Sequence, residues 1–364
     1  MQTVALSTLI FILPLIVLPF GVSFFEAPKV LIAQFLIQIL AVSVLFQKRL
    51  FRQLDLNLLK LVLGLIILSI ISLIFEGSSQ LIFGNVFRMQ GVLLLWHLGL
   101  LSIIGSRIDF KPNLYLVLIS LAAISVSSFL FGEVNNRAVG SLGSANALAA
   151  VAVFFFPFLF LTKNSYLKLI ALILTGVVII LTGSRSGVIA FVVELIFLLL
   201  FFCLNLNLKR SLLITLLLIL TSLLLPFFEE KIVFNRVYKF ESRAQVWDVS
   251  FHAGLSKPIL GWGFGNVQTA LRETAKKMNK DIQYVNVDSA HNLFLDFWIQ
   301  GGILGVGLLV GFLGFGVIGL MRGEQVVLLV SLLGVLTSML FNPASIVSLV
   351  HFWFLIGQGF KRVE

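Results

Sequence analysis

Three polar stretches interrupt a very apolar sequence, and each holds a side chain able to bind an anion or move a proton. The first is GSRSG (183–187), which lies between two apolar runs. Ser186 and Gly187 are expected to open a helix, so free backbone N–H groups and the positive end of the helix dipole would surround Arg185. The two glycines would let a ligand approach the backbone closely. Together with Ser184 and Ser186, this arrangement favours phosphate binding. An arginine that only reaches toward lipid headgroups is the alternative.

The second stretch is SRAQVWDVSFHAGLSKP (242–258), which is typical of a short amphipathic helix on a membrane surface. Ser242 and Gln245 fit a capping box at its start. One apolar stripe is expected along it, formed by Val246, Trp247, Phe251 and Leu255. Arg243 falls in the first turn, where it is a candidate anion ligand, and Trp247 is a candidate substrate contact. A surface helix whose arginine is only solvated is the alternative.

The third stretch is DSAHN (288–292), which precedes a long apolar run. Asp288 or Ser289 is expected to cap a helix that begins near His291. Because an unperturbed imidazole titrates near pH 6.5, His291 is a candidate base at ambient pH. Its neighbour Asn292 is a candidate substrate contact.

Other residues carry weaker signals. The glycine-rich GWGFGN (261–266) follows no strand, so it does not fit a nucleotide fingerprint, and Trp262 within it is expected to line a groove for sugar rings. Glu194 is a carboxylate inside an apolar run, either an interhelix partner or a proton site. The single cysteine, Cys203, excludes a disulfide framework. The sequence contains no D-x-D, H-E-x-x-H or Walker motif, so no metal and no cofactor are predicted.

The composition is that of an all-α polytopic membrane protein. The chain has 364 residues, of which 59% are hydrophobic and 12% charged, and a mean hydropathy of +1.09. A soluble domain carries about twice that fraction of charge. Because a bilayer core needs roughly 20 apolar residues per helix, about twelve spans are predicted. They are residues 4–24, 28–46, 58–75, 91–106, 114–131, 147–162, 166–182, 187–205, 211–227, 303–321, 325–341 and 345–360.

The positive charges predict the orientation of these spans, and the first span is expected to be retained rather than cleaved as a signal peptide. With the N-terminus in the cytoplasm, thirteen basic residues fall in inside loops and four in short outside loops. The four outside are Lys29, Arg88, Arg137 and Arg185. Both termini are then cytoplasmic, and residues 228–302 form one large extracytoplasmic loop with short amphipathic helices between spans nine and ten. The net charge of +10 therefore reflects topology, and no nucleic-acid partner is predicted.

These features together resemble the O-antigen ligase and polymerase superfamily over most of a single membrane domain, 1–364. The resemblance rests on FGNVFRMQG (83–91), RAVGSLGSANALA (137–149), GSRSG, SRAQVW (242–247), KPILGWGFGN (257–266) and AHNLFLDFWIQGGILG (290–305), in that order. One departure is Ala145-Asn146, where the family often has Pro-Asn. The resemblance implies a type C-like membrane glycosyltransferase in the cytoplasmic membrane, metal-independent and inverting, with its active site facing outside.

The resemblance also implies the partners and the roles of the residues. The donor would be a glycan on a polyprenyl diphosphate lipid in the bilayer, and the acceptor a glycan, lipid or protein. Arg185 and Arg243 would bind the diphosphate, with Arg88 and Arg137 as further anion ligands, and His291 would deprotonate or orient the acceptor hydroxyl. The alternative is a flippase for lipid-linked glycans, which should line a path through the membrane with charge. Ligase and polymerase are not distinguished.

Overall fold

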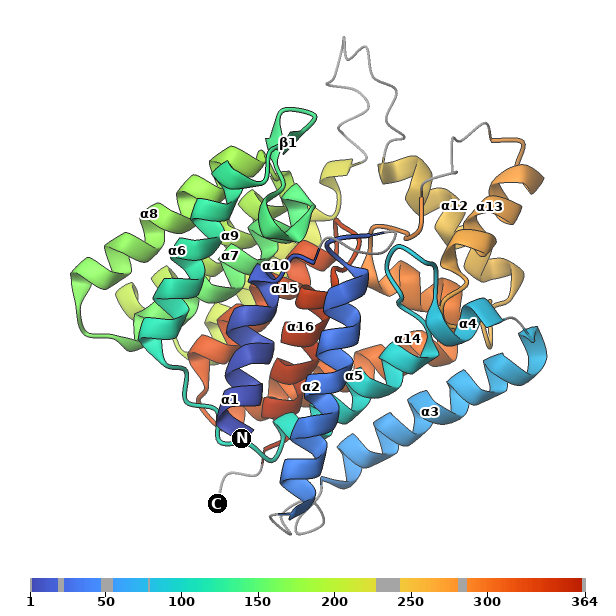
Figure 1. The fold of residues 1–364 in the computed structure, drawn as a ribbon, viewed down its shortest axis with the longest axis horizontal. Helices are drawn as coiled ribbons and strands as arrows, with labels where there is room; N and C mark the ends of the chain where they lie inside the picture. The colour runs from blue at the N-terminus through green and yellow to red at the C-terminus, as the bar shows by residue number, and fades with distance from the viewer. Residues whose placement is uncertain are drawn as a thin grey trace.

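The computed structural model describes residues 2–18, 23–46, 55–77, 79–226, 243–280 and 287–361, and these form a bundle of helices (Figure 1). The one sheet within these ranges is a hairpin of β1 (Glu133–Val134) and β2 (Arg137–Ala138). The long helices are α2 (Ala27–Phe46), α3 (Leu56–Glu76), α5 (Val92–Gly105), α6 (Leu114–Leu130), α7 (Ala145–Phe155), α8 (Ser165–Thr182), α9 (Arg185–Leu198), α10 (Leu208–Ser222), α14 (Leu293–Arg322), α15 (Val326–Met339) and α16 (Ile346–Gly359).

Shorter elements join or extend these helices. They are α1 (Gln2–Ser7), α4 (Ser79–Phe83), α12 (Arg243–Ser256), α13 (Val267–Lys277), the π-helical η1 (Thr8–Ile12) and η5 (Leu199–Cys203), and the 3₁₀ turns η2 (Leu13–Leu15), η3 (Gly140–Leu142) and η4 (Phe156–Leu161). The first helical run ends at Leu15, after which Ile16 is extended. The predicted span 4–24 is therefore wrong at its C-terminal end.

The chain is an all-α, multi-pass membrane protein by length and apolarity of its helices. Five helices in the described ranges are long and apolar enough to cross a bilayer: α2, α3, α8, the run Arg185–Cys203, and α14. Six further apolar helices are shorter than 18 residues. Twelve spans therefore remain a prediction, as does the extracytoplasmic loop.

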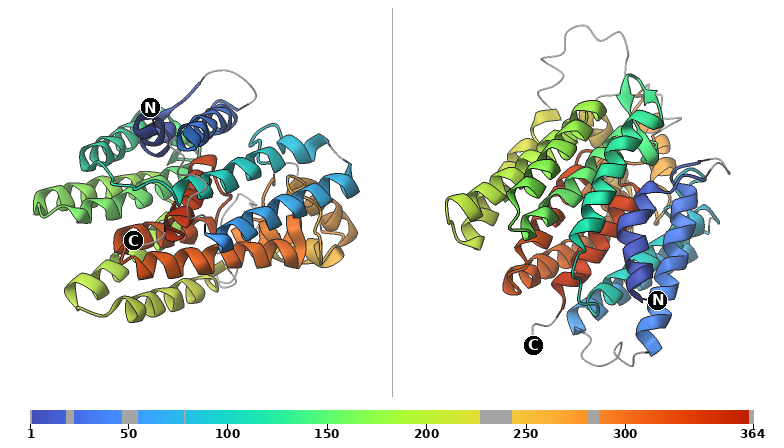
Figure 2. Two further views of the ribbon diagram at one scale, coloured as in Figure 1. Left: turned by 90° about the horizontal axis from the view of Figure 1, so that it is seen from below. Right: turned by 60° about the vertical axis from the view of Figure 1, so that its left-hand side comes forward.

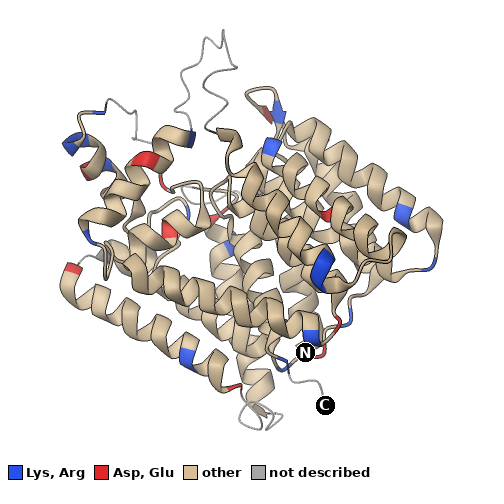
Figure 3. Cartoon of the chain, turned by 180° about the vertical axis from the view of Figure 1, so that it is seen from behind, with Lys and Arg blue, Asp and Glu red and all other residues tan. Residues whose placement is uncertain are grey.

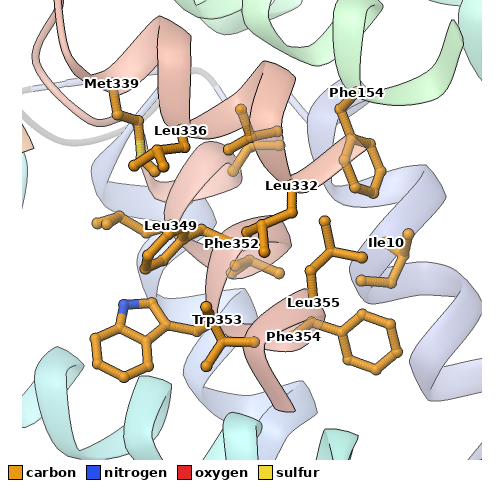
Figure 4. Close-up of a cluster of buried hydrophobic side chains, with 14 of the residues drawn as sticks. Ile10, Phe154, Leu332, Leu336, Met339, Leu349, Phe352, Trp353, Phe354 and Leu355 are labelled. Carbon is orange, nitrogen blue, oxygen red and sulfur yellow. The ribbon is translucent and has the colours of Figure 1, made fainter. Parts of the chain in front are cut away.

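The two helices α15 and α16 form the centre of the bundle. Nearly all of their side chains are buried, in contrast to outer helices such as α2, α3 and α8, which each expose large apolar side chains. Figure 4 shows the packed cluster, which includes Leu332, Leu336 and Met339 of α15 and Leu349, Phe352 and Trp353 of α16. Glycines let α16 approach its neighbours closely, since a Cβ on Gly357 would lie 2.3 Å from the Ser102 carbonyl oxygen in α5.

The ends of the bundle differ in what they carry. The start of α1 and the end of α16 lie toward one end, whereas the β-hairpin, α12 and α13 lie toward the other (Figures 1 and 2). Most charged residues lie near the ends of helices and in α12 and α13, and the helix middles are largely uncharged (Figure 3). This arrangement agrees with termini that share one side of the membrane. The side itself stays a prediction.

Helix α14 contains a kink, and the glycine-rich turn fills it. Gly302 adopts φ 58°, which breaks the helical pattern. The carbonyl oxygens of Ile299 and Gln300 accept instead from the backbone N–H groups of Trp262 (2.8 Å) and Gly263 (3.0 Å). The N–H of Ile303 donates to Pro258 (2.8 Å). The turn thus satisfies the backbone groups that the kink exposes.

Candidate functional site

The first turn of α9 places the serines of the GSRSG stretch at a helix N-terminus. Ser184 is the N-cap, and its Oγ accepts from the N–H of Gly187 (3.1 Å). The helix begins at Arg185, so the expectation that Ser186 and Gly187 open it was wrong by one residue. Gly187 serves packing, because a Cβ there would lie 2.6 Å from the Cβ of Ala149 in α7. Helix α7 therefore occupies the space beside Gly187 that a ligand was predicted to approach.

Arg137 of the β-hairpin is tied to this turn by neutral groups. Its Nε donates to the carbonyl oxygen of Thr182 (2.7 Å) and its Nη2 to Oδ1 of Asn146 (2.7 Å). The same Oδ1 accepts from the hydroxyl of Ser184 (2.9 Å). Both acceptors are neutral oxygens rather than carboxylates, so these two contacts leave the positive charge of Arg137 uncompensated.

Asn342 extends this chain of contacts to Arg243. The hydroxyls of Ser184 and Ser186 lie 3.0 Å apart, and the side-chain amide of Asn342 donates to Ser186. Oδ1 of Asn342 accepts from Nη2 of Arg243 (3.4 Å) at the first residue of α12. We call this set the arginine network: Arg137, Asn146, Ser184, Ser186, Asn342 and Arg243.

Arg185 adds a second positive charge beside Arg137. Its side chain is exposed at the start of α9, whereas Ser184 and Ser186 are fully buried. Burial and, second, the charge of Arg185 lower the pKa of Arg137. Two like charges at a helix N-terminus create a positive potential that favours a bound anion.

His291 lies just before α14 in a left-handed conformation. Its φ is 58°, a region that non-glycine residues occupy rarely and mostly at special sites. Its backbone N–H donates to the hydroxyl of Ser289 (3.0 Å). Burial lowers the pKa of His291 to about 4, and the charges of Arg243 and Arg88 act in the same direction. The imidazole is therefore neutral at ambient pH.

The segment around His291 is fixed by its neighbours. Asn292 is the N-cap of α14, with Oδ1 accepting from the N–H of Phe294 (2.9 Å) and Nδ2 donating to the Leu340 carbonyl oxygen (3.1 Å). The prediction that Asp288 or Ser289 is the cap was therefore wrong. Asp296, in the first turn of α14, instead accepts from the hydroxyl of Ser289 (2.7 Å). The contacts of Asn292 are structural, and its contact with substrate stays a prediction.

Arg88 is already paired with a carboxylate. Its Nε donates to Oδ2 of Asp288 at 2.5 Å, and its Nη1 lies 3.5 Å from the Ala344 carbonyl oxygen. Oδ2 of Asp288 also accepts from Asn85 (3.3 Å). An anion at Arg88 would have to compete with this carboxylate, and its role as a further anion ligand stays a prediction.

The connection 340–345 contacts both the arginine network and Asn292, the residue after His291. The sequence analysis did not identify this connection as part of the site. Its carbonyl oxygens accept from the side chains of Asn292 and Gln90, and Asn342 bridges Ser186 and Arg243. The available signal was the polar break FNPAS between two apolar runs, which reads only as a turn. Because this polar turn lies between two buried helices, it can hold the buried contacts of Asn342 in a fixed position.

The two candidate tryptophans and Glu194 are buried side chains. Trp247 is buried and its ring centroid lies 6.2 Å from that of Phe341. Trp262 is also buried, and its Nε1 donates to the Ala253 carbonyl oxygen (2.8 Å). This burial leaves little exposed surface on either ring for contact with a sugar. The roles of both tryptophans as substrate contacts stay predictions. Glu194 is fully buried against Gly334 and belongs to none of these contacts.

The expected amphipathic stripe of α12 is divided between two environments. Val246 and Trp247 are buried, whereas Phe251 and Leu255 are exposed. A single stripe was therefore wrong, because α12 packs between α13 and α14 with one part of its apolar surface. The helix ends at Ser256, before Pro258 as expected. Ser242 of the predicted capping box lies outside the described residues.

Comparisons with known proteins bear on the same region. Residues 170–310 match the family described as O-antigen ligase. This segment contains Arg185, Arg243 and His291, and excludes Arg88 and Arg137. A ComP-specific O-oligosaccharyltransferase of Acinetobacter baylyi (strain ATCC 33305 / BD413 / ADP1) is 28% identical over 200 residues, which cover 51% of this chain. The match spans 36% of that relative's length. The resemblance to the O-antigen ligase superfamily is confirmed at this level.

Proposed function

We propose, from the O-antigen ligase segment at residues 170–310, that this protein transfers a glycan from a polyprenyl diphosphate lipid to an acceptor hydroxyl. The acceptor is a glycan, lipid or protein, and the reaction takes place at the outer face of the cytoplasmic membrane. The observation that supports this most is that Arg185, at the start of α9, adds a second positive charge next to Arg137 of the arginine network. A diphosphate needs neutralising charge in this position.

The reaction we infer is a direct displacement with inversion. The acceptor oxygen attacks the anomeric carbon while the bond from that carbon to the diphosphate oxygen breaks. The acceptor's proton passes to the imidazole of His291, and the polyprenyl diphosphate leaves with both electrons of the broken bond. Arg185 and Arg243 stabilise the charge that develops on the leaving group, which makes the transfer metal-independent. Arg137 adds positive charge to the site, and its contact with Asn146 links it to Ser184 and Ser186.

The test is transfer and donor binding by protein reconstituted in nanodiscs with a lipid-linked glycan. Arg185→Ala and Arg243→Ala should abolish or severely reduce transfer, while Arg272→Ala, an exposed arginine of α13, should not. The two Arg→Lys variants should recover only part of the rate, because an ammonium cannot form the bidentate contact of a guanidinium. Near-normal turnover in both alanine variants would place the diphosphate elsewhere. Lipid movement across the membrane without any transfer would instead support a flippase.

A further inference from the structure

A cavity beside Arg88 is not part of the arginine network. It has a volume of about 190 Å³ and lies between the start of α2, the segment after α4, the start of α7 and the 340–345 connection. Its lining includes Phe25, Glu26, Phe87, Arg88, Ser144 and Asp288. Drug-sized ligands occupy pockets of roughly 300–1,000 Å³, so this cavity suits one small ring rather than a long oligomer.

The charged groups of this cavity favour a hydroxyl-rich neutral ligand over an anion. Arg88 is occupied by Asp288, and Oε2 of Glu26 accepts from the N–H of Ile346 (3.0 Å). From the described residues, Oε1 of Glu26 and Oδ1 of Asp288 accept no hydrogen bond. Two carboxylate oxygens facing one arginine would repel a phosphate, but they are good acceptors for the hydroxyl groups of a ligand.

Aromatic rings supply a second recognition element. Phe87 is 59% exposed, although it lines the cavity, and Phe25 lines it from the start of α2. An exposed phenylalanine beside carboxylates offers a flat apolar face next to hydrogen-bond acceptors. A sugar ring presents the same combination, with apolar C–H groups on its faces and hydroxyls at its edge.

The position of the cavity relative to His291 gives it a place in the reaction. Asp288 lies three residues before His291, and the charges of Arg88, Asp288 and Arg243 all act on the imidazole. Arg88 and Asp288 line the cavity, whereas Arg243 belongs to the arginine network. His291 therefore lies within electrostatic reach of charged residues of both the cavity and the arginine network.

We propose that this cavity binds a sugar ring of the acceptor, with Glu26 and Asp288 accepting from its hydroxyls and Phe87 packing on its face. The inference rests on the proposed transferase and narrows its acceptor to a glycan rather than a protein side chain. Arg88 then positions Asp288 and binds no diphosphate.

The experiment compares two cavity variants with a matched control. Phe87→Ala removes the ring, Glu26→Gln removes the charge but keeps an oxygen for the N–H of Ile346, and Phe83→Ala removes an exposed phenylalanine of α4 outside the cavity. Binding of methyl glycosides of hexoses and N-acetylhexosamines to protein in nanodiscs is measured by saturation-transfer NMR without donor. Transfer from a lipid-linked glycan to an oligosaccharide and to a serine-containing peptide is measured in parallel.

Wild type and Phe83→Ala should bind at least one glycoside, and both cavity variants should weaken this binding roughly five- to tenfold. The KM for the oligosaccharide should rise in step, with the KM for the donor unchanged. Absence of glycoside binding by wild type, equal binding by all variants, or peptide transfer that depends on Phe87 would overturn the assignment. If glycosides bind as expected but wild type transfers to no acceptor, the proposed function fails and the cavity stands. If wild type transfers and both variants keep the acceptor KM, the cavity alone fails.

Discussion

Asn342 and Ser186 are joined by a hydrogen bond between the tip of the central α15–α16 hairpin and the first turn of α9. The same side chain holds Arg243 through its Oδ1 and the Ser338 carbonyl oxygen through its Nδ2 (3.1 Å). One carboxamide thus connects the centre of the bundle with two of the segments that carry the candidate anion ligands. Its donor and acceptor are both used, so its chemistry can be tested by changing one atom.

Asn342→Asp should weaken donor binding. The new carboxylate pairs with Arg243 and competes with a diphosphate, and it can no longer donate to Ser186. At an effective dielectric of about 20, two unit charges 4 Å apart interact by about 4 kcal/mol, so a rise of at least roughly tenfold in the donor KM is expected. Asn279→Asp, on the exposed end of α13, is the control. A donor KM equal to wild type in both variants would show that Arg243 does not bind the donor.

The arginine network shows how far sequence reasoning reached. GSRSG was correctly placed at a helix N-terminus because serine caps and glycine turns act locally. Asn342 could not be found in this way, since it lies 156 residues after Ser186 and only the packing of α9 against α15 brings them together. The pairing of Arg88 with Asp288 was missed for the same reason, since 200 residues separate them.

The glycine-rich turn illustrates a different difficulty. Trp262 and Phe264 were expected to pack in this turn, and the turn was expected to line a groove for sugar rings. In the structure, the backbone N–H groups of Trp262 and Gly263 complete the kink of α14, and the sugar groove stays a prediction. The sequence contains both halves of this contact, GWGFG and the Gly301-Gly302 pair. No local pattern in the sequence indicates that these two segments contact each other.

Gly302→Ala should destabilise the protein. Residue 302 has φ 58°, and a Cβ there would lie 2.5 Å from the carbonyl oxygen of Ile259. Backbone strain of this kind costs about 1–3 kcal/mol before the clash is added. Gly307→Ala in the same helix is the matched control, since its Cβ would have nothing within 4 Å. The readout is the unfolding temperature in detergent, and equal temperatures for the two variants would contradict the role of the kink.

The predicted topology can be tested by labelling. In a Cys203→Ser background, which removes an exposed thiol, cysteines are introduced at Lys209 and Lys276, both exposed. An impermeant maleimide added to intact cells should label residue 276 only, because the charge bias places 209 inside and 276 outside. Labelling of both positions from outside would refute the orientation and, with it, a site that faces outward.

His291→Ala should separate chemistry from binding. Loss of a general base typically costs roughly 10²–10⁴ in rate. Donor affinity should be nearly unchanged, since the arginines are proposed to bind the donor. Chelators should have no effect on transfer by wild type. Product formation and donor binding are measured side by side in nanodiscs. If donor binding falls as much as turnover, His291 is a ligand or a structural residue rather than a base.

The low pKa of His291 also predicts how the stability of the protein depends on pH. Since the folded-state pKa is about 4 and the unfolded value is near 6.5, charging the imidazole favours unfolding. The stability that the neutral imidazole contributes is therefore present above pH 6.5 and is lost as the pH falls toward 4. The unfolding temperature of wild type should drop over this window more than that of His291→Gln, and equal drops would contradict the low pKa.

Donor binding should raise this pKa. Burial lowers the pKa most, the charges of Arg243 and Arg88 lower it further, and a diphosphate at Arg243 would offset the larger of these two charge effects. A base is most effective when its pKa lies near the working pH, so the bound donor would make His291 a better base at the moment it is needed. The titration of His291, assigned with His291→Gln and followed by NMR, should move upward when inorganic pyrophosphate is added. Arg243→Ala should abolish the movement. A His291 titration that stays in place while pyrophosphate binds would show that the anion site and the imidazole are not coupled.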